Sequence, residues 1–220
     1  ISSLGLGGMK LGVCAAGALI SYLSQTQKNA LKHILKLTLY RPDRFMMLDA
    51  TVRHSLELAE SIRGRGRKGT LMGLLDRTVT AMGSRMLRAW SEQPLVDRTE
   101  IERRYDAVER LKMELMLLKA LQDALSPVRD IERLLSSIAY DSINARDCLA
   151  LAHSLSALPE IRSLIENQTE NLLAEAASML VDLDDVEWLL NAAINPEAPL
   201  SIKDGNIIRT GYNAELDDLR

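Results

Sequence analysis

The sequence contains few aromatic residues and few cysteines. Aromatic side chains make up 4% of the 220 residues, with one phenylalanine, Phe45, so we expect a core of aliphatic side chains on packed helices. The two cysteines, Cys14 and Cys148, lie far apart and fit neither a metal-ligand spacing nor a disulfide framework, which is typical of a reducing cytosol. We expect both to be small apolar residues that are buried or half-buried.

Long apolar runs and an excess of positive charge are also absent. No stretch reaches the roughly 18–20 uninterrupted apolar residues that a bilayer-spanning helix needs, so no membrane association is expected. The apolar segment Leu11 to Leu23 contains Ser21 and lacks the features of a secretory signal, so it is predicted to be a core helix. The formal net charge of -3 means that the chain as a whole lacks the positive field that dominates nucleic-acid affinity.

Motifs for catalysis and cofactor binding are missing as well. No Gly-x-x-x-x-Gly-Lys-Ser/Thr sequence occurs, so no ATP site is expected within this chain. His33, His54 and His153 are not accompanied by a Gly-x-Ser-x-Gly or cysteine-protease signature. The acidic clusters at 182–185 and 217–218 lack calcium-loop or zinc spacing, and helix capping explains them. The sequence therefore predicts no catalytic residue, no cofactor site and no metal site.

Apolar residues recur at spacings of three and four along most of the chain, which is typical of amphipathic helices. From Ile101 to Leu125 they form a single stripe that predicts one long helix, which Pro127 separates from the next. The segment 31–39 is ambiguous between helix and strand, and Phe45 to Leu48 suits a strand or an extended segment. Further helices are predicted at 13–27, after Asp49 or Thr51 through Leu58, at 80–90, 128–138, 149–158, from Pro159, at 172–180, from Asp184 and from Asn213.

One β signal interrupts the helical pattern near the C-terminus. Asp204-Gly205 is a strong two-residue turn between the short segments 201–203 and 206–208, which predicts a β-hairpin over Leu200 to Ile208. The predicted fold class is therefore mainly α, a multi-helix domain with a small β-hairpin element near the C-terminus.

The segment 63–69, Arg-Gly-Arg-Gly-Arg-Lys-Gly, predicts a flexible basic loop. Its positive charges, on Arg63, Arg65, Arg67 and Lys68, could make weak, salt-sensitive and sequence-independent contact with phosphate. An ordinary solvated loop is the favoured interpretation, because no aromatic residue is interleaved for base stacking.

The segment 71–95 contains the most informative pattern. Met82, Met86 and Trp90 fall on one side of a helix that Thr80 can cap through its hydroxyl. Gly83 lies inside that helix, where glycine costs about 0.5–1 kcal/mol relative to alanine. Either it permits close approach of another backbone, which is the favoured interpretation, or it marks a hinge.

Four blocks of sequence form a recognisable pattern when they are taken in order: 45–51 with 56–58, then 71–95, then 104–108, and finally 204–205 through 211–212 to 215–220. Together they resemble the core, or lever, domain of the MutS DNA mismatch-repair family. The sequence departs from the family pattern at His54, where asparagine is usual, and at Ser137 and Ala145.

The resemblance implies that the chain is part of a longer protein and is not itself an enzyme. Residues 1–12 would be a linker from a preceding connector domain, 13–212 the core domain, and 213–220 the start of the helix that leads to a DNA-holding clamp. The domain would couple that clamp to a C-terminal ATPase outside this chain. The candidate coupling residues are Thr80, Gly83, Arg85, Trp90 and Arg104.

The resemblance also implies properties of the parent protein. It would bind mismatched DNA through other domains, use ATP and Mg²⁺, form a homodimer, and act with downstream repair proteins such as MutL in the cytoplasm, near the nucleoid. Two alternatives remain: a helical protein-interaction scaffold unrelated to DNA repair, and an RNA- or DNA-binding module that acts through the basic loop. The net charge disfavours the second alternative.

Overall fold

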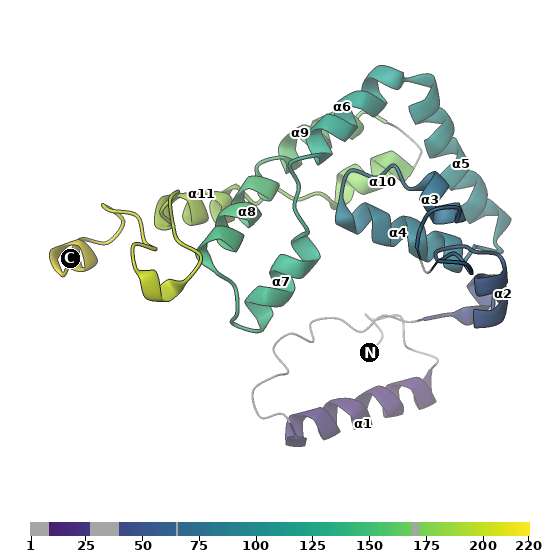
Figure 1. Ribbon diagram of the computed structural model, residues 1–220, viewed down its shortest axis with the longest axis horizontal. Coiled ribbons are helices and arrows are strands. Elements are labelled where there is room, and N and C mark those ends of the chain that lie inside the picture. Colours follow the sequence, from purple (N-terminus) through teal and green to yellow (C-terminus); the bar gives the residue numbers. More distant parts are fainter. Residues whose placement is uncertain (1–8, 27–39, 65, 169–171) are drawn as a thin grey trace.

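The computed structural model describes residues 9–26, 40–64, 66–168 and 172–220, and this part of the chain is an elongated arrangement of helices (Figure 1). The ambiguous segment 31–39, His33, Arg65 and most of the predicted linker 1–12 lie outside the described residues. The helices are α1 (Lys10–Thr26), α2 (Ala50–Ser55), α3 (Leu71–Leu75), α4 (Ala81–Glu92), α5 (Arg98–Met113), α6 (Leu115–Leu125), α7 (Ile131–Ala139), α8 (Ala145–Leu155), α9 (Leu158–Ile165), α10 (Leu172–Met179), α11 (Asp184–Ala193) and α12 (Ala214–Asp218).

Side-chain caps start many of these helices, because the first N–H groups of a helix have no partner within it. Thr80 and Asn213 cap α4 and α12 as predicted, and Asp49 caps α2. α2 ends at Ser55, so Leu58 lies after the helix rather than on it. The prediction that Asp184 caps α11 is wrong: Leu183 takes the cap position without a side-chain bond, and Asp184 is the first helical residue.

The buried side chains form two clusters, each in a different group of helices. The first cluster joins α6, α9 and α10, with Leu111 of α5 packed against it, and we call these four helices the first body. The second cluster joins α7 and α8, with Leu190 of α11 packed against it, and these three helices are the second body. The clusters are aliphatic, as the low aromatic content predicted. Their buried members are Leu121, Ala124, Val128, Ala157, Ile161, Ile165 and Ala177 in the first, and Leu134, Leu151 and Leu155 in the second.

The chain passes between the two bodies at the short connections 126–130, 156–157 and 180–183. The first connection is fastened to α8, because the backbone N–H of Arg129 donates to Oγ of the fully buried Ser154 of that helix at 2.9 Å. Ile131 packs against both clusters. The bodies therefore meet at a waist made of these three connections and of Ile131 and Leu158, which pack across it, and Figure 1 shows this waist between α8 and α10.

The predicted long helix from Ile101 to Leu125 is wrong, because it divides into α5 and α6 at Glu114. The backbone of Glu114 leaves the helical region, at φ -112° and ψ 72°. The bend lets Leu111 of α5 and Leu121 of α6 contribute to the first cluster together. Leu115 and Met116 at the corner are exposed instead, so the apolar stripe does not lie on one straight face.

The predicted β-hairpin near the C-terminus is also wrong, since the described residues contain isolated β-bridges but no strand. Ile202–Asp204 is a 3-10 turn, and Gly205 follows it with φ 70°. The next segment pairs with the end of α11 instead, through a bridge between Ile208 and Ile194. This non-local pairing half-buries Ile208, whereas Ile202 on the other side of the turn stays 70% exposed.

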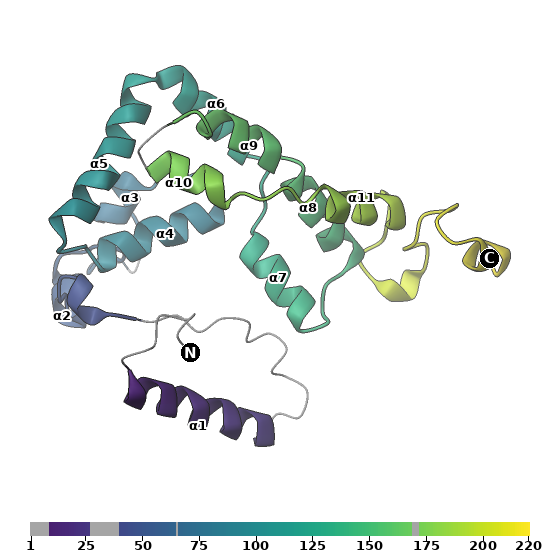
Figure 2. The ribbon, with the colours of Figure 1, turned by 180° about the vertical axis from the view of Figure 1, so that it is seen from behind.

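α1 forms a helix as predicted, but it is not a core helix. None of its residues is buried, and it lies apart from both bodies in Figure 1 and Figure 2. Cys14 on α1 is accordingly exposed, contrary to expectation. Cys148 on α8 is partly buried, and this burial raises the pKa of its thiol.

Candidate coupling site around α4

α4 lies within the segment 71–95, which contains the most informative sequence pattern. It makes no extended interface with another helix of the described chain. Met82 anchors it by packing against the first cluster. Its other connections are polar or aromatic contacts of single side chains. These contacts define the candidate site.

Asp76 joins the N-terminal end of α4 to the preceding loop. Its carboxylate accepts hydrogen bonds from the hydroxyls of Ser84 and Thr78, both at 2.6 Å, and pairs with Arg67 at 3.1 Å. These bonds lower the pKa of Asp76 from 3.8 to about 2, and the hydrogen bond from Ser84 has the largest effect. The sequence analysis did not identify Asp76. Its position four residues before the Thr80 cap was the available signal.

Thr80 and Gly83 lie together at the start of α4. Oγ1 of Thr80 accepts a hydrogen bond from the N–H of Gly83 at 3.1 Å. A Cβ atom on Gly83 would lie 3.0 Å from that oxygen and 3.3 Å from Cβ of Thr78. The close neighbours of Gly83 are thus side chains of its own capping loop, not the backbone of another element. A hinge at Gly83 stays a prediction.

Arg85 joins α4 to the start of α7. Its guanidinium donates to both carboxylate oxygens of Asp130, at 2.7 and 2.8 Å, and also to Glu132, at 2.6 and 3.1 Å. These bonds raise the pKa of Arg85 above its ordinary value, and the bonds to Asp130 have the largest effect. Arg85 in turn is the main cause that lowers the pKa of Asp130.

Trp90 and Arg104, two of the predicted coupling residues, lie in contact. The guanidinium carbon of Arg104 on α5 lies 3.6 Å from the centroid of the Trp90 ring, which is a cation–π contact. Partial burial lowers the pKa of Arg104, and Glu100 opposes this effect. α4 is therefore attached to α7 by Arg85 and to α5 by Trp90.

The basic loop is attached to the molecule rather than free along its length. Arg67 pairs with Asp76, and its carbonyl accepts the hydroxyl of Thr70 at 2.7 Å. Arg63 and Lys68 are exposed, and they remain candidates for weak phosphate contact. Regular structure is absent from the described part of the loop, as predicted.

Gly73 is a further constrained residue that sequence reasoning missed. A Cβ atom there would lie 2.0 Å from the carbonyl oxygen of Arg67, so only glycine fits this backbone. The repeated pattern Thr-x-Met-Gly, at Thr70 to Gly73 and Thr80 to Gly83, was the available signal. In both places the threonine hydroxyl accepts from the glycine N–H.

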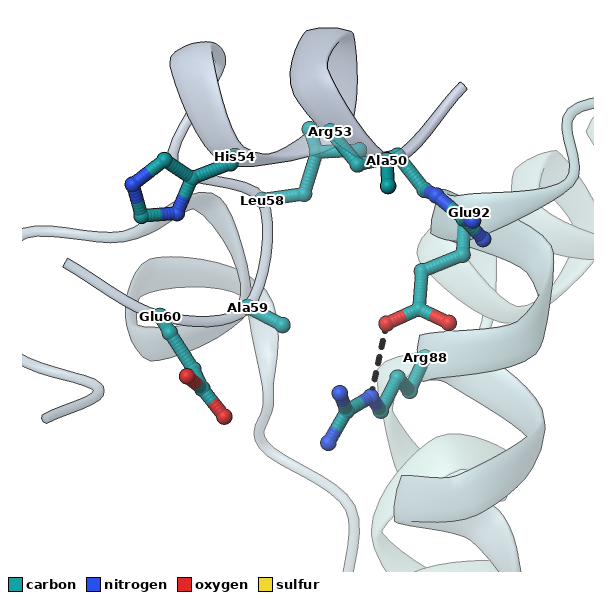
Figure 3. Close-up of a pocket in the computed structure, with 8 residues that line it drawn as sticks. All are labelled: Ala50, Arg53, His54, Leu58, Ala59, Glu60, Arg88 and Glu92. Atoms are coloured by element: carbon teal, nitrogen blue, oxygen red, sulfur yellow. Dashed lines mark hydrogen bonds and ion pairs between the residues drawn. The ribbon is translucent and has the colours of Figure 1, made fainter. Parts of the chain in front are cut away.

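A surface hollow of about 240 Å³ lies between α2, the segment 58–60 and α4 (Figure 3). Arg88 and Glu92 of α4 line one side and form an ion pair of 2.8 Å within the helix. Arg53 and His54 of α2 line another side. The hollow contains none of the predicted coupling residues.

Ion pairs and a cation–π contact that tie separate helices together define a helical structural domain. Residues 51–219 match the family MutS domain III, and the chain belongs to this family. No cluster of potential metal ligands occurs in the ranges that the structure covers. Within those ranges, no helix has the length and hydropathy needed to cross a bilayer.

Whole-chain comparisons agree with the family match. The chain is 44% identical over 219 residues to the DNA mismatch repair protein MutS of Alkaliphilus oremlandii, covering 100% of this chain and 25% of that protein. It is 47% identical over 209 residues to MutS of Pelotomaculum thermopropionicum, covering 94% of this chain and 24% of that protein. The chain thus spans about a quarter of the length of these relatives.

Proposed function

We propose that this chain is the lever segment of a DNA mismatch repair protein, and that it transmits movement between a DNA-holding clamp and an ATPase located elsewhere in the parent. The supporting observation is the attachment of α4. Single side chains join it to three separate parts of the molecule: Ser84 to Asp76, Arg85 to α7 and Trp90 to α5. A helix held at its ends by a few directional contacts can pass a displacement to its neighbours.

The remaining roles belong to the parent and rest on the family membership. The parent would bind mismatched DNA and hydrolyse ATP with Mg²⁺, act as a homodimer, and work with partners such as MutL in the cytoplasm, near the nucleoid. The chain itself would contribute no catalytic residue. The family membership does not favour the alternative of a helical scaffold unrelated to DNA repair.

DNA binding by the isolated 220-residue chain tests this proposal. With a net charge of -3 and few exposed cations in the basic loop, the chain is expected to bind duplexes weakly and without sequence preference, and to release them at physiological salt. Fluorescence anisotropy with matched and mismatched duplexes, at low and physiological salt, measures this. Discrimination of a mismatch by the chain alone would contradict the lever assignment.

A pair of charge-matched variants shows where any low-salt binding resides. Replacing Arg63 and Lys68 with glutamine should reduce it, because both side chains are exposed in the basic loop. The control replaces Arg98 and Lys119, which pair within their own helices and lie outside the loop. An equal loss in both variants would show that the loop is not a phosphate contact.

A further inference from the structure

The two bodies are joined by something other than their covalent connections. α4 belongs with the first body, because Met82 packs against the first cluster. Arg85, one turn further along α4, bonds to Asp130 and Glu132 at the start of α7 in the second body. Figure 1 shows the N-terminal end of α4 facing this start of α7. The contact therefore spans the waist.

The geometry of the contact fixes a direction as well as a distance. Arg85 uses Nε and both terminal nitrogens, so its planar fork is held by two carboxylates at once. Asp130 also caps α7 by accepting from the N–H of Arg133 at 3.2 Å. Because one carboxylate both caps α7 and accepts the fork, the orientation of the α7 axis is linked to the position of Arg85.

The same contact is partly open to solvent. The Arg85 side chain is 49% exposed, that of Glu132 is 69% exposed, and that of Asp130 is 21% exposed. Exposed ion pairs contribute little to stability and are screened by salt, so this one can be broken without unfolding either core. Beneath it, the Ser154 to Arg129 bond and the shared packing of Ile131 keep the waist connected.

We propose that the Arg85–Asp130–Glu132 fork is a releasable latch that sets the angle between the two helical bodies. When it is closed, the second body is held in one orientation relative to α4. When it opens, the bodies can swing about the waist while each keeps its own core. This inference rests on the proposed lever function and identifies the contact whose release that function would use.

The latch is tested by a distance measurement between the bodies in the 220-residue chain. Spin labels at Glu109→Cys on α5 and Ser136→Cys on α7, with Cys14 and Cys148 replaced by alanine, report the separation by pulsed electron resonance. The wild-type sequence should give one narrow distance distribution at low salt. Arg85→Gln should broaden or shift that distribution, with helix content by circular dichroism unchanged.

Conservative variants separate the latch from a merely structural role. Asp130→Asn keeps a good capping side chain but removes the charge that faces Arg85. Glu132→Gln removes the second negative charge that faces Arg85, at an exposed site. Both should broaden the distribution, and these two variants decide the matter if Arg85→Gln does not fold. Arg88→Gln is the control, because Arg88 pairs with Glu92 within α4 and not with a residue of another helix. High salt should broaden the wild-type distribution toward that of Arg85→Gln.

An unchanged distribution in folded Arg85→Gln, or in both conservative variants, would overturn the latch. This measurement requires neither DNA nor nucleotide, so its failure is distinct from failure of the lever function. The link between them is tested in the full-length parent, where Arg85→Gln should weaken the effect of mismatched DNA on ATP hydrolysis and Arg88→Gln should not. Equal effects of the two variants would contradict a role of the latch in coupling.

Discussion

Gly73 and Gly83 occupy the same position in two similar capping sequences, yet their surroundings differ. A Cβ at Gly73 would clash with the carbonyl oxygen of Arg67 at 2.0 Å, whereas at Gly83 it would meet threonine side-chain atoms at 3.0 and 3.3 Å. We therefore expect Gly73→Ala to lower the free energy of unfolding by about 1–3 kcal/mol. For Gly83→Ala, the gain in helix propensity of about 0.5–1 kcal/mol offsets the tighter contact.

Urea denaturation followed by circular dichroism measures both variants. Gly73→Ala that is as stable as Gly83→Ala would show that the loop around Arg67 relaxes freely. The larger side chain in Gly83→Val should still destabilise the chain, by about 1–3 kcal/mol, because the threonine side chains would have to move.

Asp76 predicts a dependence of stability on acid. Its pKa is about 2 in the folded chain, against 3.8 ordinarily, so its bonds stabilise the fold fully above about pH 4. This contribution is lost as the pH falls through the folded pKa, because the carboxylate becomes protonated in both states. The difference in melting temperature between the wild type and Asp76→Asn should therefore shrink between about pH 4 and pH 2.

Melting curves over that pH range check the expectation. Asp106→Asn, which changes an exposed acid of α5, is the charge-matched control. A wild-type advantage over Asp76→Asn that stays constant across the range would rule out a titrating role for this carboxylate.

The capping residues that the sequence predicted correctly have local partners. Thr80 and Asn213 bond three residues ahead, so their spacing is visible in the sequence. Arg85 was selected from the family resemblance, but its partners Asp130 and Glu132 lie 45 and 47 residues away. Such a distant pairing depends on how helices pack, which one sequence does not reveal.

At the scale of elements, the contact of Trp90 with Arg104 attaches α4 to α5. A cation over an aromatic face contributes about 0.5–1 kcal/mol when exposed and about 2 kcal/mol when desolvated. Trp90 is 37% exposed and Arg104 is partly buried, so we expect a coupling energy of about 1 kcal/mol between them. A double-mutant cycle of Trp90→Leu and Arg104→Gln, measured by urea denaturation, gives this value directly.

The matched cycle pairs Trp90→Leu with Arg98→Gln, because Arg98 is on α5 but bonds to Glu102 instead. That cycle should give a coupling energy near zero. Equal coupling in the two cycles would mean that Arg104 acts through general charge rather than through the ring.

The elements that sequence reasoning placed wrongly share one cause, which is non-local packing. A period of three and four continues through Glu114, so the sequence alone favours one helix where the structure bends to fill the first cluster. Likewise, Asp204-Gly205 favours a local hairpin, whereas Ile208 finds a better partner in Ile194. In both cases the tertiary contact outweighs the local preference.

At the scale of the whole molecule, composition and periodicity were sufficient to predict a mainly helical, aliphatic domain. They could not predict the division into two bodies, because the apolar stripe of a helix does not show which other helix packs against it. α1 illustrates this limit, since an apolar sequence such as Leu11 to Leu23 predicts burial but not the surface that provides it.

The order of the helices along the chain has a consequence for any attempt to separate the two bodies. The first body contains α5, α6, α9 and α10, while α7 and α8 are inserted between them and α11 follows. No continuous stretch of sequence therefore includes one whole body without helices of the other. A protease that cuts the connection 126–130 would leave two pieces that still share a core, and neither body can be produced as a simple truncation. Synthesis of the chain must reach α11 before the second body can be complete, and by then every helix of the first body has already been synthesised.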